Sequence, residues 1–335
     1  MTHPRISRRR LTGCAAFLAL CALGSIHARP AAAQGIVSLA DACAASDPGA
    51  LTDWCQEVAL AVQAVQGGAG MALAGGADLP GSASTLGRRM GRMPRISVHA
   101  GLTLARAGLP NVLDGDAAPA PESNFFLVAG RFGANAGVFD GFSLGSTVGG
   151  VLAVDLLGSY TVLGLPSDEG FEEGIGGLGY GAKIGLVRES FTLPGISLSW
   201  ARKDFGGFGF GSSQGGDGAR LDADLNVTSV RALVGKDMFS FSILGGYGWD
   251  TYRSDATIVA RVPGSSISGT ASARDIETHR NLWFVSGSLN SLLLQLTGEA
   301  GWASGFDRVF EDRPTGGYDP QSGSPFGSLA IRITL

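Results

Sequence analysis

The sequence predicts an all-β chain, a closed antiparallel transmembrane β-barrel of about ten strands (range roughly 8 to 14), behind a small N-terminal helical segment. After Pro94, apolar and polar residues alternate with the period of a strand that has two different faces. Only 16% of the residues are charged, 53 of 335 are glycine and the mean hydropathy is +0.20, so the chain is more apolar than ordinary soluble domains. Residues 326–335 end the chain on an alternating apolar stripe, which needs neighbours on both edges.

Residues 1–33 have the three parts of a secretory signal peptide. A basic run at 5–10 precedes an apolar stretch at 11–26, and small residues follow before Gln34. We predict export through the Sec pathway and cleavage after Ala33, with Ala28 as the second choice. Residues 11–14 resemble a lipoprotein motif, but such a motif follows the apolar stretch, whereas this one opens it.

Cys43 and Cys55 are the two cysteines of the predicted mature chain. An even pair in an exported protein predicts a disulfide, with two free buried thiols as the alternative. Residues 51–74 carry apolar side chains at three-to-four spacing and predict a helix. Residues 34–93 therefore form a helical segment separate from the strands, and its position stays open: a plug in the barrel, a cap on the periplasmic mouth, or a segment packed outside.

Ten segments in residues 94–335 fit the strand pattern and make up the predicted barrel domain. They cover residues 94–106, 122–133, 148–163, 174–191, 194–206, 217–235, 237–261, 268–290, 291–304 and 325–335. Some connections between them are short, whereas others are long and polar or glycine-rich. In outer-membrane barrels the short turns face the periplasm and the long loops face outward.

Each predicted strand has an apolar and a polar face. Large rings on the apolar stripes, towards strand ends, are predicted to form an aromatic girdle: Trp200, Phe239, Phe241, Tyr247, Trp249 and Trp302. Ionisable residues on the opposite faces are predicted to be lumen-facing: Arg95, His99, Asp155, Lys183, Arg220, Asp222, Asp224, Asp250, Glu299 and Arg332. A soluble β-sandwich would alternate in the same way and solvate its polar face, and the position of the rings favours the barrel.

The export signal, the alternating strands and the terminal strand together resemble Gram-negative outer-membrane β-barrel proteins. Leu329, Ile331, Ile333 and Leu335 match the alternating assembly signal of that group, which commonly ends on an aromatic residue rather than leucine. The resemblance covers residues 94–335 and is one of architecture. It implies an outer-membrane location, contact with outer-membrane lipids and recognition by the barrel assembly machinery.

The sequence offers little for catalysis. A strand would place Asp275, Glu277 and His279 on one face, but we interpret this group as the rim of a strand that leaves the membrane. Acidic loops at 168–174 and 317–323 are interpreted as solvated carboxylates rather than a cation site. We therefore predict no catalytic residue, cofactor or metal site, and the net charge of -4 gives no footprint for nucleic acid.

Two functions are predicted ahead of an outer-membrane lipid-modifying or proteolytic enzyme, which comes third. The first is a small channel or transporter for small or hydrophobic molecules, with the N-terminal helix regulating passage of the cargo. The alternative is a closed structural or surface-interaction barrel that binds a partner through its long extracellular loops. About ten strands enclose a lumen only slightly wider than side chains can fill. The sequence predicts neither the cargo nor the oligomeric state.

Overall fold

The computed structural model describes residues 31–335 apart from 90–92, 114–119, 144–148, 173, 212–217, 262–266 and 311–316. The predicted signal peptide lies outside the described residues except for 31–33. Residues Ala32–Leu335 form one compact unit. No helix among the described residues is long and apolar enough to cross a membrane.

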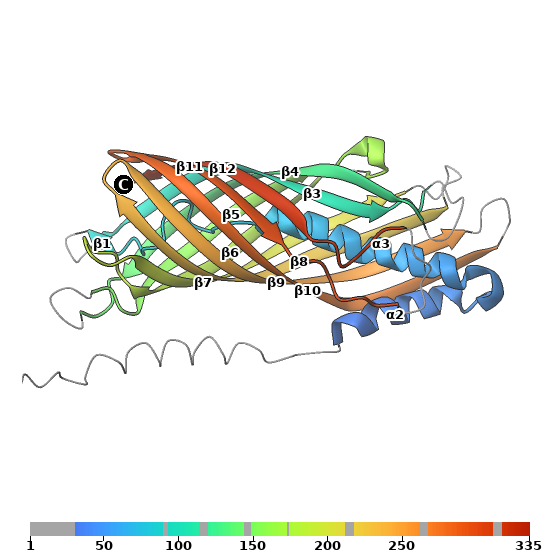
Figure 1. Ribbon diagram of the computed structural model, residues 1–335. Helices are drawn as coiled ribbons and strands as arrows, with labels where there is room; N and C mark the ends of the chain where they lie inside the picture. The colour runs from blue at the N-terminus through green and yellow to red at the C-terminus, as the bar shows by residue number, and fades with distance from the viewer. Residues whose placement is uncertain are drawn as a thin grey trace, which may run out of the picture. The chain divides into compact units, whose positions relative to one another are not determined.

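The described residues form a closed antiparallel barrel of ten strands (Figure 1), which confirms the predicted fold class. Each strand pairs with the next along the chain, and the last pairs with the first. The strands are β3 (Ile96–Pro110), β4 (Glu122–Phe139), β5 (Ala153–Gly164), β6 (Ile175–Val187), β7 (Gly195–Phe210), β8 (Ala219–Met238), β9 (Phe241–Arg261), β10 (Ser268–Ser291), β11 (Leu294–Ala303) and β12 (Ser324–Thr334). A short 3-10 helix, η2 (Ser167–Glu169), lies between β5 and β6.

Strand β12 closes the barrel onto β3. Leu329 lies opposite Leu102 in this pairing, and the backbone N–H of Leu335 donates to the carbonyl of Ile96 at 2.8 Å. The other edge of β12 pairs with β11. The apolar C-terminal stripe therefore has a strand on each side and is not a free sheet edge.

The barrel wall is apolar outside and polar inside. Leu102 and Phe132 are 60% and 64% exposed on the outer face, whereas Lys183 and Arg231 point inward and are 0% exposed. A soluble protein does the opposite, because burying a charge is costly unless it is paired. The reversed distribution is that of a barrel whose outer face contacts lipid.

The two ends of the barrel differ. Two-residue turns at 239–240 and 292–293 lie at the end where β3 begins and β12 finishes, which we call the short-turn end. The longest connection, 304–323, lies at the opposite end, the long-loop end. The C-terminus and the short strand β1 (Arg88–Arg89), which pairs with β2 (Met93–Pro94), lie at the short-turn end (Figure 1).

Near the long-loop end the inner face of the wall is apolar and the outer face is polar. Part of the prediction of lumen-facing residues is therefore wrong. In β8, Leu221 and Leu225 are buried on the inner face. Three residues predicted to face the lumen lie on the outer surface instead: Arg220, Asp222 and Asp224. Strands β8 to β10 have 20, 21 and 24 residues, whereas about 9–11 cross a bilayer. Their ends therefore leave the lipid, so their outer face meets water while their inner face packs against a helix.

Helix α3 (Pro48–Ala74) is that helix, and it runs inside the barrel (Figure 1). The Asp47 side chain caps it by accepting the N–H of Ala50, and Pro48 occupies the first turn, where its missing N–H costs nothing. Buried residues occupy all sides of the helix, as expected for a helix enclosed by protein. Glycines permit this close fit, since a Cβ at Gly70 would overlap the ring of Tyr252 on the wall.

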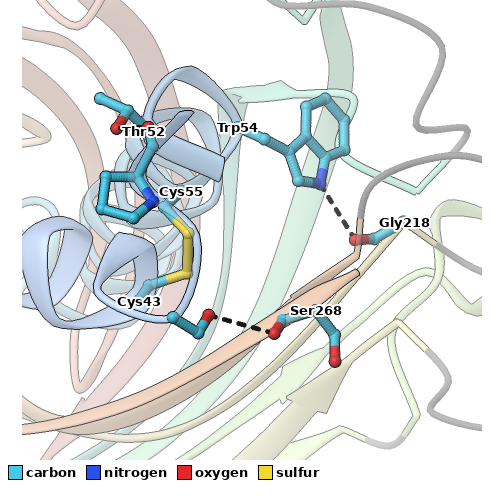
Figure 2. The surroundings of a disulfide bond; sticks show 8 residues. Cys43, Thr52, Trp54, Cys55, Gly218 and Ser268 are labelled. Carbon is cyan, nitrogen blue, oxygen red and sulfur yellow. Dashed lines mark hydrogen bonds between the residues drawn. A yellow bond between two sulfur atoms is a disulfide. The ribbon is translucent and has the colours of Figure 1, made fainter. Parts of the chain in front are cut away.

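Helix α2 (Ala31–Ala44) and the start of α3 form a helical hairpin at the long-loop end. A disulfide joins Cys43 to Cys55 across the hairpin, with a Cα–Cα distance of 5.8 Å (Figure 2). The Trp54 indole donates to the carbonyl of Gly218 at 3.1 Å, and the hydroxyl of Ser46 donates to the carbonyl of Ser268 at 3.2 Å. These bonds attach the hairpin to the ends of β8 and β10.

Candidate functional site

The N-terminal segment occupies the lumen along the length of the barrel. After α3 ends at Gly75, residues 75–87 continue through the interior to the short-turn end, and most of them are buried. We call α3 together with residues 75–87 the plug. The way in which the wall holds the plug is the candidate functional site, because it decides whether the lumen can conduct.

Three cations of the wall hold the C-terminal end of α3. Arg131 on β4 donates to the carbonyl of Leu73 at 2.8 Å, and Lys203 on β7 donates to the same oxygen at 3.4 Å. Arg231 on β8 donates to the carbonyls of Ala74 at 2.8 Å and Gly76 at 3.2 Å. The last carbonyls of a helix lack partners within it and carry partial negative charge, and the last turn of α3 contains no basic residue. The wall therefore supplies the cap that the helix itself lacks.

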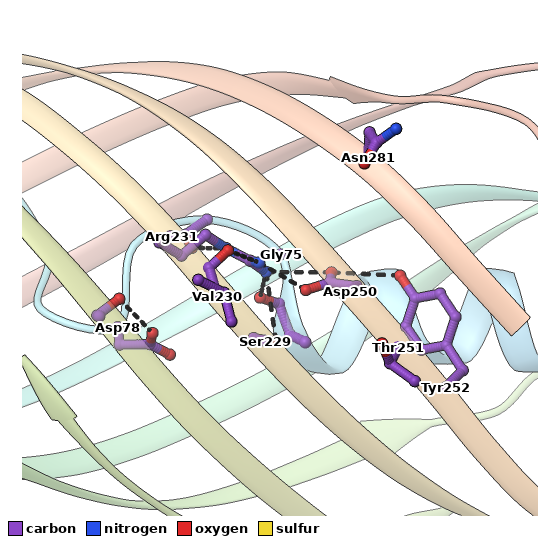
Figure 3. A network of polar contacts seen from close by, with 12 residues as sticks. Gly75, Asp78, Ser229, Val230, Arg231, Asp250, Thr251, Tyr252 and Asn281 are labelled. Carbon is purple, nitrogen blue, oxygen red and sulfur yellow. Dashed lines mark hydrogen bonds and ion pairs between the residues drawn. The ribbon is translucent and has the colours of Figure 1, made fainter. Parts of the chain in front are cut away.

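Buried carboxylates pair with two of these cations, Arg231 and Lys203. Arg231 and Asp250 form a bidentate pair at 2.5 and 3.1 Å, and the Tyr252 hydroxyl donates to Asp250 at 3.3 Å (Figure 3). Asp78 of the plug pairs with Lys203 at 3.4 Å and accepts the hydroxyl of Ser199 at 3.2 Å. These two ion pairs persist at this depth because each opposite charge is accompanied by further hydrogen bonds.

A second set of contacts holds residues 76–87 lower in the barrel. Lys183 donates to the carbonyls of Ser82 at 2.6 Å and Ser84 at 3.1 Å, and Asp155 accepts the N–H of Leu86 at 2.8 Å. Gln295 donates to the carbonyl of Gly81 at 3.0 Å. Gly81 has a φ of +69°, a conformation that favours glycine. The wall thus recognises the backbone of the plug more than its side chains.

A third contact lies nearer the long-loop end. The amide of Gln66 on α3 donates to the carbonyl of Ile276 at 3.1 Å and to the Ser254 hydroxyl, and it accepts the hydroxyl of Thr278 at 3.1 Å. Arg280 donates to the carbonyl of Gly67 at 3.3 Å. The plug is therefore bonded to the wall at three levels of the lumen.

At the short-turn end, hydrogen bonds join the end of β8 to the connection between β6 and β7. Lys236 at the end of β8 donates to the carbonyls of Ser190, Phe191 and Leu193 in the connection between β6 and β7. The Glu189 carboxylate accepts the N–H of Asp237 at 2.6 Å. Burial, together with the negative charge of Asp237, raises the pKa of Glu189 above its ordinary value, although that N–H and Lys236 oppose the shift.

The structure places six of the predicted lumen-facing residues on the inner side of the wall: His99, Asp155, Lys183, Asp250, Glu299 and Arg332. Four of them bond the plug or support a residue that does: Asp155, Lys183, Asp250 and Glu299. Glu299 accepts the N–H of Ala77 at 3.3 Å, and His99 lies 3.3 Å from the amide of Asn135. Arg95 precedes β3 and is exposed at the short-turn end rather than enclosed by the lumen.

The residues that hold the helix end were not predicted from the sequence: Asp78, Arg131, Lys203 and Arg231. Arg231 is an isolated charge on the polar phase of an otherwise apolar stretch, a signal that could have identified it. That Arg131 and Lys203 bond backbone carbonyls cannot be read from sequence, because carbonyl positions depend on where the plug lies.

Five predicted girdle rings lie on the outer face and are about half exposed: Trp200, Phe241, Tyr247, Trp249 and Trp302. Tyr247 and Trp249 contact each other with ring centroids 4.8 Å apart. Phe239 stands at the tip of the turn between β8 and β9 and is fully exposed. The terminal aliphatic residues also point outward: Leu329, Ile331, Ile333 and Leu335.

Glu277 and His279, which the sequence places on one face of a strand, lie on the outer surface near the long-loop end. His279 contacts Glu277 at 3.0 Å and the hydroxyl of Thr251 at 3.0 Å, while Glu277 pairs with Arg253 at 2.5 Å. His279 is the register partner of Thr251, and Glu277 that of Arg253. Cross-strand pairing accounts for the contacts with Thr251 and Arg253, and Glu277 and His279 are neighbours on one face of β10.

Comparison with known proteins gives matches of architecture. No protein-family model and no curated protein matches the chain. Among solved structures it is similar to the translocator domain of the autotransporter NalP from Neisseria meningitidis (12% identity, 72% of this chain, 88% of that chain, TM-score 0.38). It is also similar to Ail from Yersinia pestis (8%, 72%, 99%, TM-score 0.28) and the toluene transporter TodX from Pseudomonas putida (7%, 77%, 96%, TM-score 0.32). These neighbours are outer-membrane β-barrels.

Proposed function

We propose that this chain is an integral outer-membrane protein of a Gram-negative-type bacterium, closed by its own N-terminal segment, that acts through the surface at its long-loop end. The observation that carries the proposal is the filled lumen. Helix α3 is buried on all sides from Glu57 to Ala74, and residues 75–87 are bonded to the wall down to the short-turn end. A barrel filled in this way functions as a scaffold for its surface rather than as a pore.

The outer-membrane placement is supported by the chain's own features. The outer face carries an apolar band with aromatic rings, and at the level of this band the inner face is polar. Residues 1–33 have the pattern of a Sec signal peptide. We expect outer-membrane lipids as neighbours and the barrel assembly machinery as a partner during insertion, since the terminal stripe has the alternation of an assembly signal.

The long-loop end presents the surface that we propose to be functional. It combines the disulfide-linked hairpin of α2 and α3 with the connections that follow β3, β5, β7, β9 and β11. The hairpin is held to the tops of β8 and β10 and thereby offers a fixed shape. Preorganised surfaces lose less entropy on binding, so a partner outside the cell is the expected ligand. We propose no catalytic role for the Glu277 and His279 group.

A channel with a movable plug is the second candidate, and one observation favours it. A cavity of about 1290 Å³ opens at the short-turn end beside the last residues of the plug, and a smaller one of about 110 Å³ lies beside α3 at the long-loop end. The plug separates the two cavities. Conduction would require residues 75–87 to leave the wall.

A reversible tether between plug and wall separates the two functions. A Cβ at Gly235 on β8 would lie 3.1 Å from the Cβ of Ala83 in the plug, so a small outward shift of the plug would give the spacing of about 3.5–4.5 Å found in disulfides. Ala83→Cys/Gly235→Cys, refolded and recorded in planar bilayers before and after reduction, should show no conductance in either state if the barrel is closed. Openings that appear only after reduction would establish the channel instead.

The wild-type chain and each single-cysteine variant serve as controls for this recording. Retained resistance to SDS without heating would show that every sample contains a folded barrel. Conductance of the wild type that the oxidised tether does not alter would contradict the filled lumen itself.

A further inference from the structure

The cavity of about 1290 Å³ at the short-turn end has two kinds of lining, and we call it the vestibule. Its floor consists of residues 82–86 of the plug and the end of β12. Its sides are the connection between β6 and β7 and the turn between β8 and β9. The proposed surface at the other end does not use this cavity.

The vestibule is lined by more cations than carboxylates. The cations are Arg88, Arg95, Arg188, Lys236 and Arg332, against Asp140, Glu189 and Asp237. Arg188 pairs with Asp140 at 3.5 Å, and Lys236 pairs with Glu189 at 3.5 Å. Within the described part of the chain, Arg88, Arg95 and Arg332 form no ion pair, and neither does Asp237, so the unpaired charge of the lining is positive on balance.

Arg332 is the most unusual of these arginines. It points inward from β12, and its Nε and Nη1 atoms are buried with no hydrogen-bond partner among the described residues. A buried donor without an acceptor costs free energy, and a buried charge costs more. An oxyanion in the vestibule would offset this charge at the part of the guanidinium that lines the cavity, and guanidinium groups commonly pair with phosphate.

The rim of the vestibule is apolar and exposed. Phe191 and Phe239, at neighbouring turn tips, are 98% and 105% exposed, and Met238 and Phe241 line the same side. Phe239 has a φ of +38°, a conformation in which glycine or asparagine is favoured over an aromatic residue. Turn geometry therefore does not account for a phenylalanine at this position.

The rim continues into the surface that contacts lipid. Phe241 and Ile243 are exposed on the outer face of β9, in line with the girdle ring Tyr247. A molecule on the rim can thus keep its apolar part in the bilayer while its polar part reaches the vestibule. A free phosphate would use only the cations, and a neutral lipid would use only the rim.

We propose that the vestibule binds an anionic glycerophospholipid of the adjacent leaflet, with the phosphate group at Arg332 and Arg95 and the acyl chains across Phe191 and Phe239. This inference rests on the membrane placement proposed above. Basic pockets on membrane proteins commonly bind anionic headgroups, at roughly 1 kcal/mol per basic residue, about a fivefold change in affinity.

Lipid retention measured by native mass spectrometry tests the proposal. The full chain is refolded into nanodiscs of equal parts phosphatidylglycerol and phosphatidylcholine with identical acyl chains, and is then released in mild detergent. We expect retained phosphatidylglycerol to exceed phosphatidylcholine by about fivefold or more for the wild type. Arg95→Gln/Arg332→Gln should lose this preference. Equal retention of both lipids by the wild type would overturn the proposal.

Two further variants distinguish binding of the phosphate group by the arginines from binding of the acyl chains by the rim. Arg202→Gln removes an exposed arginine on the outer face of β7, paired with Asp204 at 3.0 Å, and should keep the preference. Phe239→Asn suits the positive φ and should reduce the total lipid retained without changing the headgroup preference. A preference that survives in Arg95→Gln/Arg332→Gln would refute the assigned cations.

Titration with inorganic phosphate distinguishes a lipid from a free anion. Calorimetric binding of phosphate as tight as that of phosphatidylglycerol would show a soluble-anion site and contradict the lipid. Resistance to SDS without heating, measured for every variant, reports the barrel itself. Its loss in the wild type would count against the membrane placement and not against the vestibule alone.

Discussion

Arg231 shows at the scale of one residue how this barrel tolerates charge in its interior. Its guanidinium bonds two carbonyls of the plug and both oxygens of Asp250. The side chain thus satisfies the end of α3 and is itself neutralised. Removing it would leave a buried carboxylate unpaired and two carbonyls without a donor, which makes this position more sensitive than an exposed arginine.

We therefore expect Arg231→Met to lower the free energy of unfolding by about 3–5 kcal/mol, because a broken buried pair leaves its partner charged. Arg231→Met/Asp250→Asn should recover part of this loss, but not the share that comes from the plug carbonyls. Urea unfolding of the protein refolded in lipid vesicles measures both. Arg202→Met, which breaks an exposed pair on the outer face, should cost at most about 1 kcal/mol. Equal effects of Arg231→Met and Arg202→Met would contradict the buried cap.

Helix α3 is the element that turns an ordinary barrel into a closed one, and its fit depends on glycine. Helix propensity alone favours alanine over glycine by about 1 kcal/mol. At Gly70, however, a Cβ would overlap the Tyr252 ring, whereas at the exposed Gly49 the nearest atom to a Cβ would be 3.6 Å away. The same substitution in one helix should therefore have opposite signs at the two positions.

We expect Gly70→Ala to destabilise the protein by about 1–3 kcal/mol through overpacking, and Gly49→Ala to be neutral or stabilising. The measurement is the urea midpoint of each variant in the same vesicles. If both substitutions stabilise the protein, α3 does not pack against the wall as described.

The elements were predicted from sequence to different degrees, for physical reasons. Each strand could be found because alternation is a local pattern, and the closing strand followed from an apolar stripe that needs two neighbours. The outward direction of Asp222 could not be found in this way. The local pattern in β8 is the same inside and outside the bilayer, and only the position of the lipid boundary decides which face is apolar.

The candidate site was less predictable than the wall. The helix at 51–74 follows from the spacing of its apolar residues. A helix that is buried on all sides, however, has no polar face that would indicate how it is oriented against its neighbours. The wall recognises backbone carbonyls of Leu73, Ala74 and Gly76, which have no signature in the side chains of those residues. The charges on the wall were therefore visible in the sequence, whereas their partner was not.

For the whole molecule, the path of the chain has a consequence for topology. The chain begins with the hairpin at the long-loop end, descends through the lumen as the plug, and starts β3 at the short-turn end. If long loops face outward, as in outer-membrane barrels, and the proposed signal peptide is removed, the new N-terminus lies outside the cell although it precedes every strand.

An epitope inserted between Gln34 and Gly35 should therefore bind antibody on intact cells. The same epitope inserted after Phe239, in the turn at the short-turn end, should bind only after the outer membrane is permeabilised. The two insertions share one chain and one epitope, so a difference between them reports the side of the membrane rather than expression. Binding at Phe239 but not at Gln34 on intact cells would reverse the orientation. Binding at neither position without permeabilisation would mean that the hairpin is not exposed at the surface, and the partner proposed for the long-loop end would then have to act without it.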